Sequence, residues 1–231
     1  KPFIPINHLE AHVLSSFFNN EISFPHICLL LTGGHTQIYY LKDINNINLI
    51  GETIDDAVGE AFDKVAKILG LPYPGGHEIE KKALDGNENF FDLPQPLIKE
   101  DNLNFSFSGL KTNINLLTKK NKIDDNFVRN ISASFQKSVS NILVKKLGKA
   151  IKNFKNTDEK NLSISVVGGV ANNKYLKKNF DKFGDENGLK ILYPPKYMLS
   201  DNAAMIAWTT LFKYSKINNI NFKPDPRLII S

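Results

Sequence analysis

A continuous apolar run that ends in two glycines constrains the fold of this chain more than any other segment. Residues 27–32 (ICLLLT) show no alternation of polar and apolar side chains, which indicates a strand buried on both faces. Gly33-Gly34 follows, and residues 36–41 (TQIYYL) have the composition of a second strand. The pattern predicts a hairpin around a glycine loop that a ligand can approach closely.

Helical patterns surround this hairpin and predict a mixed α/β domain. Residues 53–69 repeat apolar side chains at helical spacing, with Thr53 and Asp56 as an expected capping box and Gly70 as the stop. Other expected helices cover 8–18, 127–154 and 201–214, and other expected strands cover 163–167 and 189–193, with one more helix between these two strands. The Asn-rich stretches 44–48, 87–89 and 218–221 are expected to be surface turns.

Composition and charge exclude several classes of protein. A chain with 42% hydrophobic and 23% charged residues is typical of globular proteins and excludes disordered and collagen-like ones. Residues 27–31 form the longest apolar run, far short of the roughly 20 residues that cross a bilayer, so we expect no membrane span. The single cysteine, Cys28, excludes an intramolecular disulfide and suggests a reducing compartment. The net charge of +5 permits a polyanionic partner.

Two histidines four residues apart form a candidate metal site. His8 and His12 would share one face of a helix, where both imidazoles can reach one ion. Glu10 is rotated off that face, so the segment is not the HExxH motif of zinc proteases. The pair alone also fits ordinary surface or packing histidines. A third, hard ligand would complete the site, and the candidates are Asp55, Asp56, Glu60, Asp63 and Asp201.

Glycine pairs recur beside strand and helix ends and indicate anion binding. Gly33-Gly34, Pro74-Gly75-Gly76 and Gly168-Gly169 could each expose backbone N–H groups to a phosphate. No GxxxxGK[ST] P-loop occurs in the sequence. A dinucleotide fingerprint is also absent, because Gly33-Gly34 leads into a strand rather than a helix. Any one loop could be a plain tight turn, but three favour a nucleotide. A glycine hairpin that holds phosphate is typical of the actin, Hsp70 and sugar-kinase superfamily.

Three polar side chains near these loops have both a functional and a structural interpretation. Asp63 could bind a ribose hydroxyl or a cation, or belong to a solvated acidic face with Asp56 and Glu60. Asn173 could bind a base or sugar edge, or cap a helix. Asp201 could be a metal ligand or the N-cap of the helix that follows it.

Six segments in order carry a resemblance to one family. They are NHLEAH (7–12), LLLTGGHTQI (29–38), GETIDDAVGEAFDKVAKILGLPYPGG (51–76), NFSFSGLKT (104–112), VVGGVANN (166–173) and SDNAAMIAW (200–208). Together they resemble the TsaD family of tRNA adenosine threonylcarbamoyltransferases, in its bacterial and organellar form, over nearly the whole chain. The resemblance implies an α/β fold of the actin-like ATPase type with two lobes.

The resemblance also implies an acyltransferase reaction, in which threonylcarbamoyl-AMP donates its threonylcarbamoyl group to N6 of adenosine 37 in tRNAs that read codons beginning with A. One divalent metal per subunit, iron (Fe²⁺) or zinc, would be held by His8, His12 and Asp201, with no separate catalytic nucleophile. The implied substrate-binding residues are Leu30, Leu31, Thr32, Gly33, Gly34, Asp63, Gly76 and Asn173. The implied partners are tRNA, TsaB and TsaE, in the bacterial cytoplasm or in a eukaryotic organelle.

The resemblance sets expectations for domains as well. Residues 1–24 would end the first lobe, 25–200 would form the second lobe, and 201–231 would return toward the first. Because family members carry a further upstream segment, we expect an N-terminally truncated chain. Three departures from the family pattern affect only fine geometry: Asn7 stands for a common His, His77 for Pro, and Leu199-Ser200 for Cys-Thr.

Three alternatives compete with this interpretation. A generic nucleotide-hydrolysing or sugar-kinase-like protein of the same fold would need carboxylates for Mg²⁺ rather than the His8 and His12 pair. A non-catalytic scaffold related to the family would lack the metal residues. A protease, the family's former description, would need a catalytic motif that the sequence does not contain, and Cys28 lies in an apolar strand.

Overall fold

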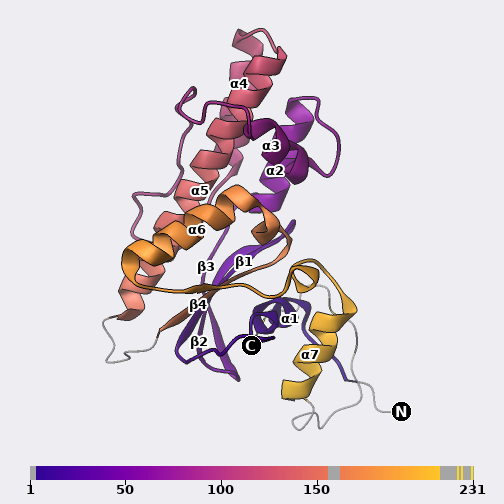
Figure 1. The fold of residues 1–231 in the computed structure, drawn as a ribbon, viewed down its shortest axis with the longest axis vertical. Coiled ribbons are helices and arrows are strands. Elements are labelled where there is room, and N and C mark those ends of the chain that lie inside the picture. The colour runs from indigo at the N-terminus through magenta and orange to yellow at the C-terminus, as the bar shows by residue number, and fades with distance from the viewer. Residues whose placement is uncertain (1–3, 156–161, 214–222, 224, 226–229, 231) are drawn as a thin grey trace.

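The computed structural model describes residues 4–155, 162–213, 223, 225 and 230 (Figure 1). Its centre is a five-stranded sheet of order β3-β2-β1-β4-β5. The strands are β1 (His26–Leu31), β2 (Thr36–Asp43), β3 (Asn46–Glu52), β4 (Ser163–Val167) and β5 (Ile191–Leu192). Strand β1 pairs antiparallel with β2 and parallel with β4. The predicted hairpin and the strand at 163–167 are therefore confirmed, and the strand expected over 189–193 is shorter.

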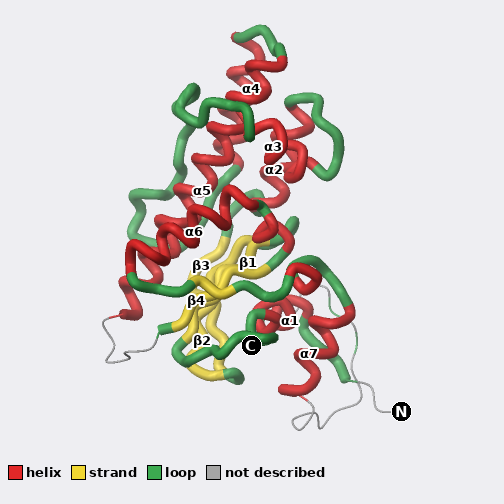
Figure 2. Tube along the Cα trace, in the orientation of Figure 1, coloured by secondary structure: helices red, strands yellow, loops and turns green. Residues whose placement is uncertain are grey.

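Helices cover both faces of the sheet (Figure 2). The helices are α1 (His8–Ser15), α2 (Val58–Ile68), α3 (Gly75–Ala83), α4 (Ser108–Lys120), α5 (Asp125–Lys155), α6 (Lys174–Asn187) and α7 (Ala203–Lys213). Two short 3₁₀ turns span Gly169–Asn172 and Lys196–Met198. Within the described residues, no helix combines the length and the apolarity that crossing a membrane requires.

Strand β1 is buried on both faces, as its apolar run predicts. Ile27, Leu29 and Leu31 belong to the main core with residues of α2, α5 and α6. Cys28 and Leu30 face the opposite way, into a second cluster with residues of α1. The two faces alternate along the strand because successive side chains of a strand point to opposite sides. Helix α1 is therefore separated from α2 by the thickness of the sheet.

The predicted start of the helix at Thr53 is wrong, because α2 begins at Val58. The backbone N–H of Thr53 donates to Thr36 O at 2.9 Å, and the residue bridges to Phe105, so the segment before α2 is extended. Glu60 replaces Asp56 as the acidic partner at the helix start, since its Oε2 accepts from the N–H of Ala57 at 3.4 Å. The expected stop is confirmed, with Gly70 at a φ of +69°.

Three elements were not expected from the sequence: β3, α3 and α4. The helix expected between the strands at 163–167 and 189–193 is confirmed as α6. The turn expected over 44–48 is wrong beyond its first residues, because β3 begins at residue 46. The turn at 87–89 is confirmed, and residues 218–221 lie outside the described residues. The helix expected over 8–18 ends at Ser15, whereas α5 and α7 match their predicted ranges within two residues.

Candidate metal centre and nucleotide pocket

His8, His12 and Asp201 meet at one point, although 189 residues separate His12 from Asp201. The Nε2 atoms of His8 and His12 lie 3.2 Å and 2.9 Å from the same oxygen, Asp201 Oδ1. The candidate ligand atoms of the three residues all lie within 4.8 Å of one another. Of the five carboxylates that the sequence left open, the structure therefore brings Asp201 to the histidines.

The packing of α1 against α7 creates this convergence. Asn7 caps α1, because its side chain accepts hydrogen bonds from the N–H groups of Leu9 and Glu10. The indole of Trp208 on α7 donates to Leu14 O of α1 at 2.9 Å. Asn202, not Asp201, caps α7, since its Oδ1 accepts from the N–H of Met205. The carboxylate of Asp201 therefore faces the histidines instead of the helix that follows it.

Burial and charge prepare these side chains for metal binding. The side chain of His12 is 1% exposed, and this burial lowers its pKa despite the nearby Asp201. Burial would raise the pKa of Asp201, but the hydrogen bonds from His8 and His12 outweigh it and the net shift is downward. A neutral imidazole and an ionised carboxylate are the forms that bind metals.

The donor set fits a divalent transition-metal ion. Two imidazole nitrogens and one carboxylate oxygen are ligands that suit Zn²⁺ and Fe²⁺ better than Mg²⁺, which prefers an all-oxygen shell. His8 and Asp201 are exposed, so a substrate oxygen can approach the same point. His12 Nδ1 is buried without a hydrogen-bond partner among the described residues, so only Nε2 points toward the cluster.

The glycine loops lie against each other at the carboxyl ends of the parallel strands β1 and β4. A Cβ on Gly168, whose φ is +92°, would lie 2.4 Å from Leu31 O, and one on Gly59 would lie 2.8 Å from Gly33 Cα. Only glycine permits these approaches. In open α/β sheets, ligands bind outside the carboxyl ends of the strands.

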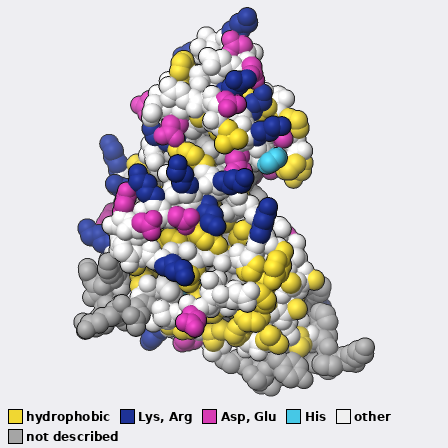
Figure 3. All heavy atoms as spheres, in the orientation of Figure 1, with side chains coloured by type: hydrophobic (Ala, Val, Ile, Leu, Met, Phe, Trp, Pro, Cys, Tyr) yellow, Lys and Arg dark blue, Asp and Glu magenta, His cyan; other side chains and the backbone are white. Residues whose placement is uncertain are grey.

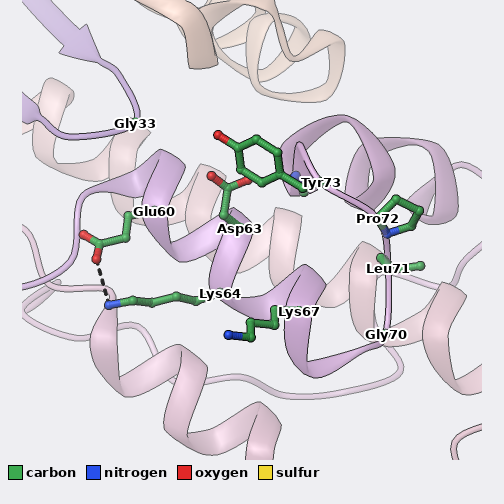
Figure 4. Close-up of a pocket in the computed structure, with 10 residues that line it drawn as sticks. Gly33, Glu60, Asp63, Lys64, Lys67, Gly70, Leu71, Pro72 and Tyr73 are labelled. Carbon is green, nitrogen blue, oxygen red and sulfur yellow. Dashed lines mark hydrogen bonds and ion pairs between the residues drawn. The ribbon is translucent and has the colours of Figure 1, made fainter.

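A pocket of about 660 Å³ opens beside Gly33 (Figure 4). Helix α2 contributes Asp63 and the loop after it contributes Tyr73, and both side chains point into the space that the figure shows. Asp63 Oδ1 accepts from the N–H of Gly75 at 2.8 Å, which joins α2 to the start of α3. A Cβ on Gly75 would lie 2.5 Å from the Ala66 Cβ, so this junction requires glycine.

The predicted nucleotide-binding residues lie around α3. Gly76 directly follows Gly75 on α3, and one turn later Glu80 Oε1 accepts from the N–H of Lys174 at 2.7 Å. Asn173, which precedes Lys174, has the structural role that the sequence also allowed: its Oδ1 caps α6 through the N–H of Leu176. Its Nδ2 donates to Gln136 Oε1 at 2.8 Å, so both ends of the amide have protein partners.

The predicted substrate loop divides into a buried part and an accessible part. The side chains of Leu30 and Leu31 are fully buried in the two cores, so they offer a ligand no side-chain surface. Gly33 and Gly34 are exposed and Thr32 is half-buried. The Thr32 hydroxyl accepts from the N–H of His35 at 2.9 Å and shapes the turn.

His35 is a residue that the sequence analysis did not single out. It follows the glycine loop and is half-buried. Burial lowers its pKa first, and the charge of nearby His8 lowers it further. His35 is therefore close enough to His8 for their charges to interact. The signal was available, since a histidine directly follows Gly33-Gly34.

The five-stranded mixed sheet with helices on both faces defines an α/β protein of the actin-like ATPase fold, as two solved structures show. Full-length HypF in a phosphate- and nucleotide-bound form shares this fold with a TM-score of 0.66 at 16% identity, over 90% of this chain and 36% of that one. HypF of T. kodakarensis gives 0.61 at 15% identity, over 89% and 36%. The chain belongs to the TsaD family, "tRNA N6-adenosine threonylcarbamoyltransferase", whose model matches residues 1–208.

Curated relatives carry the same description. The protein of Rickettsia rickettsii (strain Sheila Smith) is 44% identical over 98% of this chain and 67% of the relative. The protein of Rickettsia bellii (strain OSU 85-389) is 42% identical over 98% of this chain and 68% of the relative. The chain thus spans about two thirds of the length of these relatives.

Proposed function

We propose that this chain modifies tRNA by transferring a threonylcarbamoyl group to N6 of an adenosine. Membership of the family supports the reaction class, and the relatives' names supply both the tRNA substrate and the N6 position. The single observation that carries the proposal to this chain's own residues is the convergence of His8, His12 and Asp201. The finer details, adenosine 37 and threonylcarbamoyl-AMP as donor, follow from the resemblance described above.

The residues of the cluster and of the loops divide the work. His8, His12 and Asp201 would hold one divalent ion, iron or zinc, which when bound acts as a Lewis acid on substrate oxygens. Exposed backbone at Gly33 and Gly34 would approach the oxygens of the donor. Asp63 would accept a hydrogen bond from a ribose hydroxyl in the pocket that it lines.

The main contribution of the protein would be to position the reactants. In an adenylate, AMP is already a good leaving group, so the chain needs no separate nucleophile. Holding the acyl carbon against the adenine N6 supplies much of the rate enhancement, and donors at the oxygen where charge develops supply more. TsaB and TsaE are the protein partners that the family resemblance adds to this proposal.

The alternatives fit the cluster less well. A non-catalytic scaffold of the same fold would not require two imidazoles and a carboxylate that converge. A simple ATPase would hold Mg²⁺ through oxygen ligands. Asp201 reaches the histidines through the packing of α1 against α7, so the cluster depends on the fold of this chain.

The His12→Ala substitution tests the proposal. Because His12 supplies one of three ligands, bound metal after dialysis, measured by elemental mass spectrometry, should fall to a small fraction. Transfer of threonylcarbamoyl to tRNA, assayed with the partner proteins present, should fall by about 100-fold or more. His77→Ala is the matched control, since His77 is exposed on α3 and outside the cluster. Unchanged metal content in His12→Ala would remove this histidine from the ligand set.

A further inference from the structure

We propose that a groove between α5, α6 and the loop 95–101 binds the phosphate backbone of tRNA. The inference rests on the proposed function and adds a substrate surface to it. The groove has a volume of about 1080 Å³, and we call it the basic groove after the lysines that line it. They are Lys99, Lys145, Lys146, Lys149, Lys152 and Lys182.

Positive charge in the basic groove exceeds its local compensation. Six lysines face two carboxylates, those of Asp101 and Glu186. Helix α5 places Lys145, Lys149 and Lys152 at i, i+4 and i+7, which puts them on one face. Like charges at this spacing repel each other and destabilise the helix, so an anion that neutralises them stabilises it. Figure 3 shows several basic side chains, in dark blue, over the region of α6, with acidic side chains, in magenta, among them.

Two of the six lysines build the wall of the groove. Lys146 is almost fully buried, and its Nζ donates to Asn102 O at 2.7 Å. Lys149 Nζ donates to Glu100 O at 2.7 Å and pairs with Asp101 at 2.5 Å. These contacts tie the loop to α5. The edge of the groove is therefore held in place before any ligand arrives, which lowers the entropic cost of binding.

The other lysines keep their charge available. Lys99, Lys145 and Lys152 are exposed, and they make no hydrogen bond or ion pair with the part of the chain that the structure describes. Lys182 is 3.7 Å from Glu186, which is a loose pair on the surface. A polyanion can neutralise such groups and release the counterions around its own phosphates, which is the main source of backbone affinity.

The polar lining favours a nucleic acid over an apolar protein partner. The amides of Asn141, Asn153 and Asn179 line the groove between the lysines. Amide side chains, like lysines, donate hydrogen bonds to the phosphate and sugar oxygens of nucleic acids. Such contacts position a nucleic acid without reading its sequence, which suits an enzyme that accepts several tRNAs.

The distance from the basic groove to the glycine loop at 168–169 fits a single tRNA. Helix α6 runs from Asn173, beside the glycine loop at 168–169, to the groove residue Lys182. Nine residues of helix span about 14 Å. One tRNA extends well beyond this distance, so it can contact the basic groove while its target adenosine reaches a donor held at the glycine loops.

Neutralising the free lysines tests the inference. In the triple variant K99Q/K145Q/K152Q, tRNA affinity in low salt should fall by about tenfold or more, measured by fluorescence anisotropy. The slope of log affinity against log salt should become shallower by about 2 to 3, since each lost phosphate contact removes about 0.7 to 0.9. The matched control is K119Q/K120Q/K190Q, which removes the same charge from exposed lysines outside the groove. The control should keep its affinity within about twofold, because it leaves the groove's phosphate contacts in place.

The outcomes separate this inference from the proposed function. Equal affinity and equal slope in both triple variants, with wild-type tRNA modification intact, would overturn the groove and leave the function standing. Loss of modification with unchanged tRNA binding would indicate a protein partner at the groove and would also overturn the inference. Wild-type protein that neither binds nor modifies tRNA would overturn the proposed function itself.

A second measurement does not depend on the folding of any variant. Acetylation of wild-type lysines, followed by mass spectrometry, should show protection of Lys145 and Lys152 when tRNA is bound. Lys190 should react equally with and without tRNA. Equal reactivity of all three lysines would contradict the inference.

Discussion

Asp63 shows how one side chain can serve both the fold and the ligand. It accepts from the N–H of Gly75 and also lines the pocket. Asp63→Ala should lower the free energy of unfolding by about 1 kcal/mol and weaken binding of a non-hydrolysable adenylate, measured by calorimetry. Asp63→Asn keeps an acceptor for Gly75 but loses the charge, so it should retain stability and still bind the adenylate more weakly. Bound metal should be unchanged in both variants. Wild-type adenylate affinity in Asp63→Ala would leave this residue a purely structural role.

At the same scale, the sequence could predict two of the three residues of the metal candidate. The spacing of His8 and His12 requires only one helical turn, which local geometry supplies. The third member could not be chosen, because Asp201 joins them through the packing of α1 against α7 across most of the chain. The N-cap role that the sequence also allowed for Asp201 belongs to its neighbour Asn202. Which of two adjacent polar residues caps a helix depends on the backbone geometry, which the composition does not show.

At the scale of elements, the carboxylate of Asp55 joins the segment before α2 to the start of α4. Asp55 accepts from the backbone N–H groups of Phe107 and Ser108 at 2.8 and 3.3 Å and from the hydroxyls of Ser106 and Ser108. Asp55→Ala should therefore lower the free energy of unfolding by about 1–3 kcal/mol at pH 7, measured with urea. Asp92→Ala, another exposed aspartate, is the control and should change it little.

The pH dependence of that difference follows from the same contacts. Burial would raise the pKa of Asp55, but the hydrogen bonds from Ser106, Phe107 and Ser108 outweigh it and the pKa is lowered. A carboxyl with a lowered folded pKa stabilises the protein above its unfolded pKa of about 3.9 and loses this contribution as the pH falls through the folded pKa. The gap between wild type and Asp55→Ala should be constant from pH 5 to 8 and shrink only below about pH 4. A gap that shrinks by pH 6 would contradict this account.

Elements with one clear period could be predicted, and elements with mixed signals could not. Strand β1 and helix α5 carry long apolar patterns that tertiary contacts do not override. Strand β3 is rich in asparagine and largely exposed, so its composition indicated a turn. Helix α6 is mostly polar and was expected without bounds, although its buried residues Leu176, Phe180 and Gly184 recur at a four-residue spacing that indicates its range.

The whole molecule depends on the parallel pairing of β1 with β4, which brings both glycine loops to one edge of the sheet. His26 lies at the start of this pair with 0% exposure, and its Nδ1 and Nε2 lie 2.6 Å and 2.8 Å from the Oγ atoms of Ser163 and Ser165. Burial lowers the pKa of His26 to about 3, against about 6.5 in the unfolded chain. The neutral imidazole is therefore the form that the folded sheet accepts.

This burial makes the stability of the sheet depend on pH. Below about pH 6.5, His26 is protonated in the unfolded chain but stays neutral in the folded one. As the pH falls, the free energy of unfolding should therefore decrease by about 1.4 kcal/mol per pH unit from this group alone. His26→Gln should be less stable at pH 7 but should have a flatter profile between pH 6.5 and 4, measured by urea unfolding. His77→Gln, at an exposed histidine, should reproduce the wild-type slope. Parallel profiles for wild type and His26→Gln would show that His26 is protonated in the folded sheet. The pairing that aligns the two glycine loops would then tolerate a charge at its start.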